Sequence, residues 1–187
     1  MSKKNEKTNI TLNIQHTSLP TWDELPEIEL YMDQVIVLME KYLSDSTYPD
    51  NKIITPSMIN NYVKLGIMPA PIKKKYSREH LAYLVIICSL KQVVPLPNIK
   101  EIMENRLKSH SISEILDFYS NLYDFAFNTV IENCQNFLNS EKSNIKYIED
   151  VSIFSAIAAA NCRNISTTLF FMDNPQKNNS KILKKEN

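Results

Sequence analysis

Hydrophobic residues recur at three- and four-residue steps along most of the chain, which is the period of amphipathic α-helices. Prolines, capping residues and polar clusters divide this pattern into separate segments. Six helices are predicted, beginning near Pro26, Thr55, Ser77, Pro97, Ser111 and Glu149. The segment from Ser77 to Val94 is apolar almost throughout and is expected to be central to the core. The pattern therefore predicts an all-α fold.

The helical period is absent from three parts of the chain. Residues 1–18 and 173–187 are polar, and we expect them to be disordered tails. Residues 44–51 combine Ser, Asp, Pro and Asn, and are expected to form the loop after the first helix.

The segment from Thr55 to Gly66 carries signals for both ends of a short helix. Thr55 is a good N-cap, Pro56 suits the first helical position, and Gly66 can adopt the left-handed conformation that ends a helix. At about 100° per residue, one face of this helix is wholly apolar or aromatic. The opposite face carries Ser57, Asn60, Asn61 and Lys64.

The polar face of this helix offers groups that bind nucleic acid. Asn can bond adenine bidentately, while Ser and Lys can reach phosphates or base edges. Tyr62 falls on the apolar side, so we expect it to be structural first, with its hydroxyl as a candidate phosphate contact. Taken alone, this helix is more simply a short surface helix with its polar residues outward.

A basic segment follows the short helix. Pro69 and Pro71 should hold the backbone extended, and the candidate phosphate contacts Lys73, Lys74, Lys75 and Arg78 come next. Such a loop can clamp the phosphate backbone beside the groove that a helix enters. Taken alone, this segment is more simply a run of charged residues exposed to solvent. Together, the helix and the loop favour DNA over a protein-interaction surface.

Composition limits the alternatives. The 187 residues contain 21 basic and 21 acidic side chains, so the net charge of zero counts against a histone-like protein but not against one local basic patch. The hydrophobic content of 43% is ordinary for a globular protein. The single glycine argues against Rossmann and P-loop nucleotide sites.

Candidate chemistry outside the basic segment is sparse. Cys88, Cys134 and Cys162 are scattered in apolar company and are expected to be buried thiols in a reducing compartment. No histidine has a nucleophile or carboxylate partner in the pattern, and His80 is most simply a surface or capping neighbour. We therefore predict no enzyme, no catalytic residue, no metal and no cofactor. The polar N-terminus and the interrupted apolar stretch from Val151 to Phe171 predict a cytoplasmic protein without membrane association.

The residues singled out above also resemble a known pattern. MerR-type DNA-binding domains have a similar order of Tyr62, Leu65-Gly66, Tyr76-Ser77, Leu81 and Ile99-Lys100-Glu101. A wider pattern is similar to a Gram-positive bacterial domain-of-unknown-function family, number eighteen thirty-six, which is itself regarded as MerR-like. Its residues are Leu19 to Val35 joined to Ile54 to Gly66.

This resemblance implies an organisation for the chain. Residues 19–108 would form a MerR-like, winged helix-turn-helix domain that binds double-stranded DNA, and residues 109–172 a helical dimerisation or effector region. The chain would then be a sequence-specific transcriptional regulator, a homodimer on a near-palindromic site, with an unidentified small molecule or protein as effector. The C-terminal aromatic residues would belong to the core or to the dimer interface.

Departures from the MerR pattern leave two points open. Asn60 stands where MerR proteins commonly have arginine, and Val63 where an acidic residue follows. The usual Asn-Gly wing tip is replaced by a shorter lysine segment, with or without a β-hairpin. The alternative function is a helical adaptor that binds a protein through the acidic segment Asp23 to Asp33, or through the C-terminal helices, without binding DNA.

Overall fold

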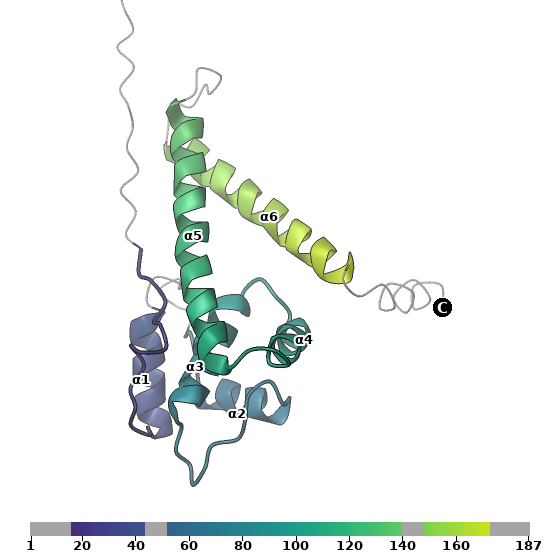
Figure 1. Ribbon diagram of the computed structural model, residues 1–187. Helices are drawn as coiled ribbons and strands as arrows, with labels where there is room; N and C mark the ends of the chain where they lie inside the picture. The colour runs from purple at the N-terminus through teal and green to yellow at the C-terminus, as the bar shows by residue number, and fades with distance from the viewer. Residues whose placement is uncertain (1–15, 44–51, 140–147, 173–187) are drawn as a thin grey trace, which may run out of the picture. The chain divides into compact units, whose positions relative to one another are not determined.

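A computed structural model describes residues 16–43, 52–139 and 148–172. Within these residues the chain forms six helices and no β-strand, which confirms the all-α prediction (Figure 1). The helices are α1 Met32–Tyr42, α2 Pro56–Lys64, α3 Arg78–Leu90, α4 Leu96–Arg106, α5 Ile112–Asn139 and α6 Ile148–Met172. The predicted tails, except for residues 16–18, and the predicted loop at 44–51 lie outside the described residues.

The described residues fall into two compact units. The N-terminal unit spans Gln15–Phe125 and contains α1 to α4 with the first half of α5. The C-terminal unit contains the rest of α5, from Ala126, and α6. No helix among the described residues is long and apolar enough to cross a membrane.

Helix α3 forms the centre of the N-terminal unit. It packs against α1 and α4. Its predicted place in the core is confirmed because eight of the nine residues from His80 to Cys88, all but Tyr83, are buried. The cap at Ser77 begins this helix, and the prolines at 95 and 97 separate it from α4. An apolar helix of this kind needs cover on all sides, which α1, α2 and α4 supply through a shared core.

The first helix starts later than predicted: at Met32, not near Pro26. Leu30 forms an antiparallel bridge with Tyr76, in which Leu30 N–H donates to the Tyr76 carbonyl at 2.9 Å and Tyr76 N–H returns a bond at 2.8 Å. The extended backbone of this bridge is incompatible with a helix. The Gln34 side chain then accepts from the Tyr31 N–H at 2.9 Å, which caps α1 just beyond the bridge.

The segment before the bridge lies along the first half of α5. Trp22 N–H donates to an Asp117 carboxylate oxygen at 2.7 Å, and the Ser120 hydroxyl donates to the Pro20 carbonyl at 2.8 Å. His16 lies 2.8 Å from an Asp124 oxygen. These bonds join the start of the described chain to the end of the N-terminal unit.

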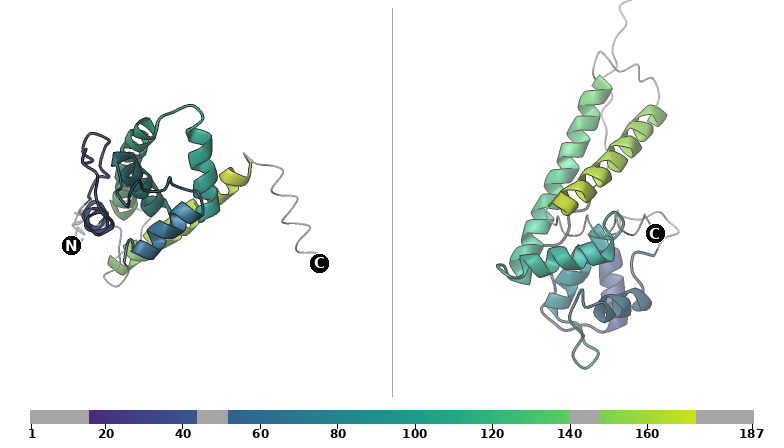
Figure 2. Two further views of the ribbon diagram at one scale, coloured as in Figure 1. Left: turned by 90° about the horizontal axis from the view of Figure 1, so that it is seen from below. Right: turned by 90° about the vertical axis from the view of Figure 1, so that its right-hand side faces the viewer.

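The C-terminal unit is a pair of helices with a small shared core. The rings of Phe137 and Phe154 stack with their centroids 4.2 Å apart, beside the buried Cys134, Leu138 and Val151. Within this unit the end of α5 and the start of α6 lie side by side (Figures 1 and 2). The prediction of three buried thiols is wrong for Cys162, which is exposed. It is confirmed for Cys134 and Cys88, and burial raises the pKa of Cys88 to about 11.

Candidate nucleic-acid interface

Both predicted ends of α2 are confirmed. The Thr55 hydroxyl accepts from Met58 N–H at 3.2 Å, and Pro56 occupies the first turn. At the other end Gly66 has a φ of 66°. Its N–H bonds the Val63 carbonyl and the next N–H bonds the Tyr62 carbonyl, which together make a Schellman motif.

Two lysines hold the ends of α2, a role that the sequence pattern did not indicate for either of them. Lys100 of α4 donates to the Leu65 carbonyl at 2.9 Å, a position where a cation also favours the negative end of the helix dipole. Lys91, directly after α3, donates to the Ile53 carbonyl and lies 3.5 Å from the Met58 sulfur. The position of α2 is therefore fixed from both sides.

The two faces of α2 separate as the helical wheel predicts. Ile59 is fully buried and Tyr62 is 2% exposed, so the structural role expected for Tyr62 is confirmed. Burial raises the pKa of Tyr62 well above its usual value, and the ring lies in the core rather than on the surface that could contact phosphate. The four predicted base- or phosphate-contacting residues, Ser57, Asn60, Asn61 and Lys64, are all exposed.

The basic segment forms a tight two-residue turn closed by a single isolated β-bridge between Ile72 and Lys75, and neither side extends into a strand; this turn is called the hairpin below. Ile72 N–H bonds the Lys75 carbonyl at 3.2 Å, and Lys75 N–H bonds the Ile72 carbonyl at 2.9 Å. Lys73 and Lys74 between them have positive φ values of 50° and 64°, as a type I′ turn requires. The hairpin projects from the end of the N-terminal unit where α2 lies (Figures 1 and 2).

The four predicted phosphate-binding cations do not form one group. Lys73 and Lys74 are exposed at the hairpin tip, and neither has an ion-pair partner among the residues that the structure describes. Lys75 lies 3.5 Å from a Glu29 oxygen and 5.9 Å from the centre of the Tyr31 ring.

Arg78 is held away from the tip. It lies 3.3 Å from a Glu27 oxygen and 5.3 Å from the centre of the Trp22 ring, and its side chain is only 17% exposed. These contacts hold the guanidinium, and its phosphate contact stays a prediction. This arginine attaches the start of α3 to the segment before α1.

His80 fixes the base of the hairpin, a role that sequence reasoning recognised only in part. Its Nδ1 accepts from Ser77 N–H at 3.0 Å, so the neutral ring carries its proton on Nε2, which donates to the Ala70 carbonyl at 3.2 Å. The predicted capping role is confirmed, but at 5% exposure His80 is buried and not at the surface. The Ser-x-x-His spacing at a helix start was the available signal.

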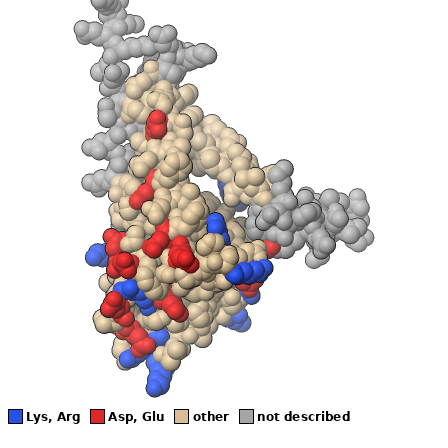
Figure 3. Space-filling model, viewed as in Figure 1, with Lys and Arg blue, Asp and Glu red and all other residues tan. Residues whose placement is uncertain are grey.

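Charge is segregated within the N-terminal unit. Residues 54–77 contain four lysines and no acidic residue, whereas residues 16–43 contain six acidic residues and one lysine. Figure 3 shows basic side chains at the lower tip, where Figure 1 places the hairpin, and acidic side chains gathered on the side of α1. The neutral chain thus carries a local positive surface around α2 and the hairpin.

The described residues contain no group of three or more His, Cys, Asp and Glu side chains that could hold a metal ion. No curated protein matches the chain. No solved structure matches it either.

A family model described as "Domain of unknown function (DUF1836)" matches residues 20–127, more than half of the 187 residues. The matched stretch includes α1 to α4, the hairpin and the first half of α5. It confirms the family predicted from the pattern around Leu19 to Gly66. The chain belongs to the DUF1836 family.

Proposed function

We propose that the chain is a DNA-binding transcriptional regulator of the MerR-like, winged helix-turn-helix type. The observation that carries this proposal is the pairing of an exposed, acid-free polar face on α2 with an exposed two-lysine hairpin at the same end of the unit. In this proposal α2 enters the major groove and the hairpin is the wing. A bacterial cytoplasmic location is part of the same proposal.

The dimensions and chemistry of α2 suit a major groove. Its nine residues span about 13 Å at 1.5 Å per residue, and the groove is about 12 Å wide. Asn60 and Asn61 are the residues that would read adenine edges, while Ser57 and Lys64 would reach phosphates or base edges. The bonds from Lys91 and Lys100 would keep this face in one orientation, which reduces the entropy lost on binding.

The lysines at the wing tip support a phosphate-binding role. A type I′ turn favours Asn-Gly because both central residues have positive φ, yet this turn contains Lys73 and Lys74. Non-glycine residues there cost on the order of 1 kcal/mol each. Retaining two lysines at a strained, exposed tip is explained most simply by a use for their charge.

The homodimer in this proposal rests on α6. From Val151 to Leu169 its only charged residue is Arg163, yet large apolar side chains on it are more than half exposed: Ile153 58%, Ile157 56%, Ile165 58% and Leu169 60%. Helices that are apolar on most sides are normally buried against other helices. A second copy of α6 is the cover we propose.

The exposed residues of α6 form a ridge that is suited to such pairing. Ile153, Ile157, Asn161, Ile165 and Leu169 follow one another at four-residue steps. Ridges of this type interdigitate when two helices cross at about −50°, the commonest packing class. Asn161 lies at the middle, where it would face Asn161 of the second copy and could fix the register of the pair. A dimer would present two α2 helices to a near-palindromic site.

Binding of a fluorescent mixed-sequence duplex, followed by anisotropy over a range of salt concentrations, tests this function. The full chain is expected to bind with affinity that falls steeply with salt. Replacing both Lys73 and Lys74 with Ala should lower the slope of log K against log salt by about 1.8 per protomer, since each lost phosphate contact contributes about 0.9.

The matched control for this experiment removes two exposed lysines that belong neither to α2 nor to the hairpin, as Lys41→Ala with Lys108→Ala. The control is expected to leave the slope unchanged within about 0.5, because neither lysine is assigned a phosphate contact. Absence of duplex binding at low salt, or an equal loss in both double variants, would contradict the proposed function.

A further inference from the structure

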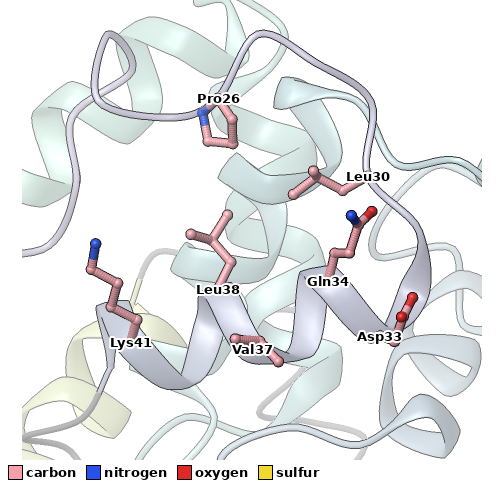
Figure 4. Close-up of a pocket in the computed structure, with 7 residues that line it drawn as sticks. All are labelled: Pro26, Leu30, Asp33, Gln34, Val37, Leu38 and Lys41. Atoms are coloured by element: carbon pink, nitrogen blue, oxygen red, sulfur yellow. The ribbon is translucent and has the colours of Figure 1, made fainter.

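An apolar groove runs along α1 in the N-terminal unit, distinct from the surface of α2 and the hairpin. Figure 4 shows it between α1 and the extended segment before it, with Leu38 directed toward Pro26 and Gln34 toward Leu30. Its volume is about 440 Å³. Val37 on its rim is 67% exposed. The groove is therefore open to a ligand, while Leu30 in its wall belongs to the core and Leu38 packs against it.

Acidic side chains outnumber basic ones in the segment that contains this groove. Asp33 and Lys41 lie at its two ends (Figure 4). Residues 16–43 carry six acidic side chains against one lysine, and two of the six, Glu27 and Glu29, are already paired with Arg78 and Lys75. Besides Asp33 and these two, the exposed carboxylates of this segment are Asp23, Glu24 and Glu40. This acidic surface would repel DNA phosphates and attract cationic ligands.

We propose that the α1 groove binds a basic amphipathic segment of another protein, with apolar side chains in the groove and Lys or Arg side chains against the carboxylates. A volume of 440 Å³ is within the range of sites that take a few apolar groups. Helix α6 of a second copy is a poor fit, because its described part carries only one basic residue, Arg163. This proposal does not depend on DNA binding.

The ends of the groove specify an orientation for that segment. Asp33 and Lys41 are eight residues apart on α1, or about 12 Å at 1.5 Å per residue. A helical ligand spans this distance in about two turns, and an extended ligand in about four residues. The basic residue of the ligand should lie at the Asp33 end, and any acidic residue at the Lys41 end.

Selection from a random 12-residue peptide library displayed on phage, with the full chain as bait, tests this proposal. Val37→Asn protein serves for counter-selection, because an exposed valine can be replaced without opening the core. Enriched peptides are expected to combine apolar residues with an excess of Lys and Arg. No enrichment, or enrichment of peptides without that excess, overturns the proposal.

The affinities of an enriched peptide for variant chains locate the site. Val37→Asn should weaken binding at least fivefold and Asp33→Asn about two- to threefold, the latter more at low salt than at high salt. The control Val93→Asn makes the same change at a valine that is 52% exposed outside the groove, and it should bind as the unmodified chain does. If the three variants bind the peptide with equal affinity, the assignment of the peptide site to the α1 groove is wrong.

Two further measurements distinguish a protein partner from a second copy of this chain as the ligand of the α1 groove. If Val37→Asn dissociates an oligomer of the chain, and the peptide does so as well, the groove joins copies of this chain and the proposal is wrong. The Val37→Asn chain is expected to bind the DNA duplex normally. Failure of peptide binding and failure of DNA binding are thus recorded independently.

Discussion

Lys73 and Lys74 combine a conformational cost with an exposed charge. Both have positive φ in a two-residue turn that Asn-Gly would fit better. Ile72 beside them is 68% exposed, so the tip gains little from packing. Stability and phosphate binding are expected to favour different residues at these two positions, and that conflict can be measured.

Replacing Lys73 with Asn and Lys74 with Gly should raise the free energy of unfolding by about 1 kcal/mol, because both residues adopt this turn with less strain. The same variant should bind DNA more weakly. Lys73→Ala with Lys74→Ala removes the charges but keeps the strain, so it should lose affinity without the gain in stability. Urea denaturation and duplex titration of both variants provide the test. Equal stabilities would show that the turn is not strained.

At the scale of elements, the hairpin is held in place by its neighbours. Tyr76 bonds Leu30 before α1, and His80 at the start of α3 bonds the Ala70 carbonyl. Arg78 adds contacts to Glu27 and Trp22. Two of these residues, Arg78 and His80, looked in the sequence like a surface cation and an isolated histidine. Their role in the structure is to fix the position of the tip lysines relative to α3.

His80→Ala should destabilise the chain by about 2 kcal/mol, since it leaves the Ser77 N–H and the Ala70 carbonyl without their partner. Amide hydrogen exchange at Lys75 and Tyr76 should become faster as the hairpin loosens. His80→Gln is the matched variant, because Gln at this position can still cap Ser77 but is not expected to reach Ala70. It should recover part of the stability and retain fast exchange at the hairpin. Unchanged amide hydrogen exchange at Lys75 and Tyr76 in His80→Ala would show that His80 does not hold the hairpin in place.

The elements also show what could be predicted from sequence and why. Helix α2 was predictable at both ends because Thr55, Pro56 and Gly66 are local signals. The start of α1 was not, because the Leu30 bridge depends on Tyr76, which is distant in sequence. The sequence also left undecided whether a hairpin forms. Its tip lacks the favoured Asn-Gly pair, and its base is fixed by bonds to residues that are distant in sequence. Exposure of the four polar α2 residues followed from periodicity alone.

At the scale of the whole molecule, a neutral net charge conceals opposite local surfaces. The stretch with α2 and the hairpin is basic, and the stretch with α1 is acidic. In the proposed regulator the first surface meets DNA, α6 meets a second copy, and the α1 groove remains available to a protein partner. Each surface is carried by different residues and can be changed without altering the others.

Ile157→Asp with Ile165→Asp should convert a dimer into monomers, because two carboxylates would be buried without partners in the α6 pair. Sedimentation equilibrium measures the change, and Val93→Asp serves as the control at an exposed position outside α6. The monomer should keep its fold, since both side chains are more than half exposed. An unmodified chain that sediments as a monomer at micromolar concentration would contradict the role given to α6.

Selection of bound duplexes from a random DNA pool, with the full chain and with its Asn60→Ala variant in parallel, tests the central claim most directly. The proposed function predicts enrichment of a near-palindromic sequence with half-sites about 10 base pairs apart. It also predicts that Asn60→Ala relaxes the preference at particular positions of each half-site, because one base contact is lost. A pool that shows no enrichment, or the same enriched sequence with both proteins, would contradict the assignment of α2 as the helix that reads DNA.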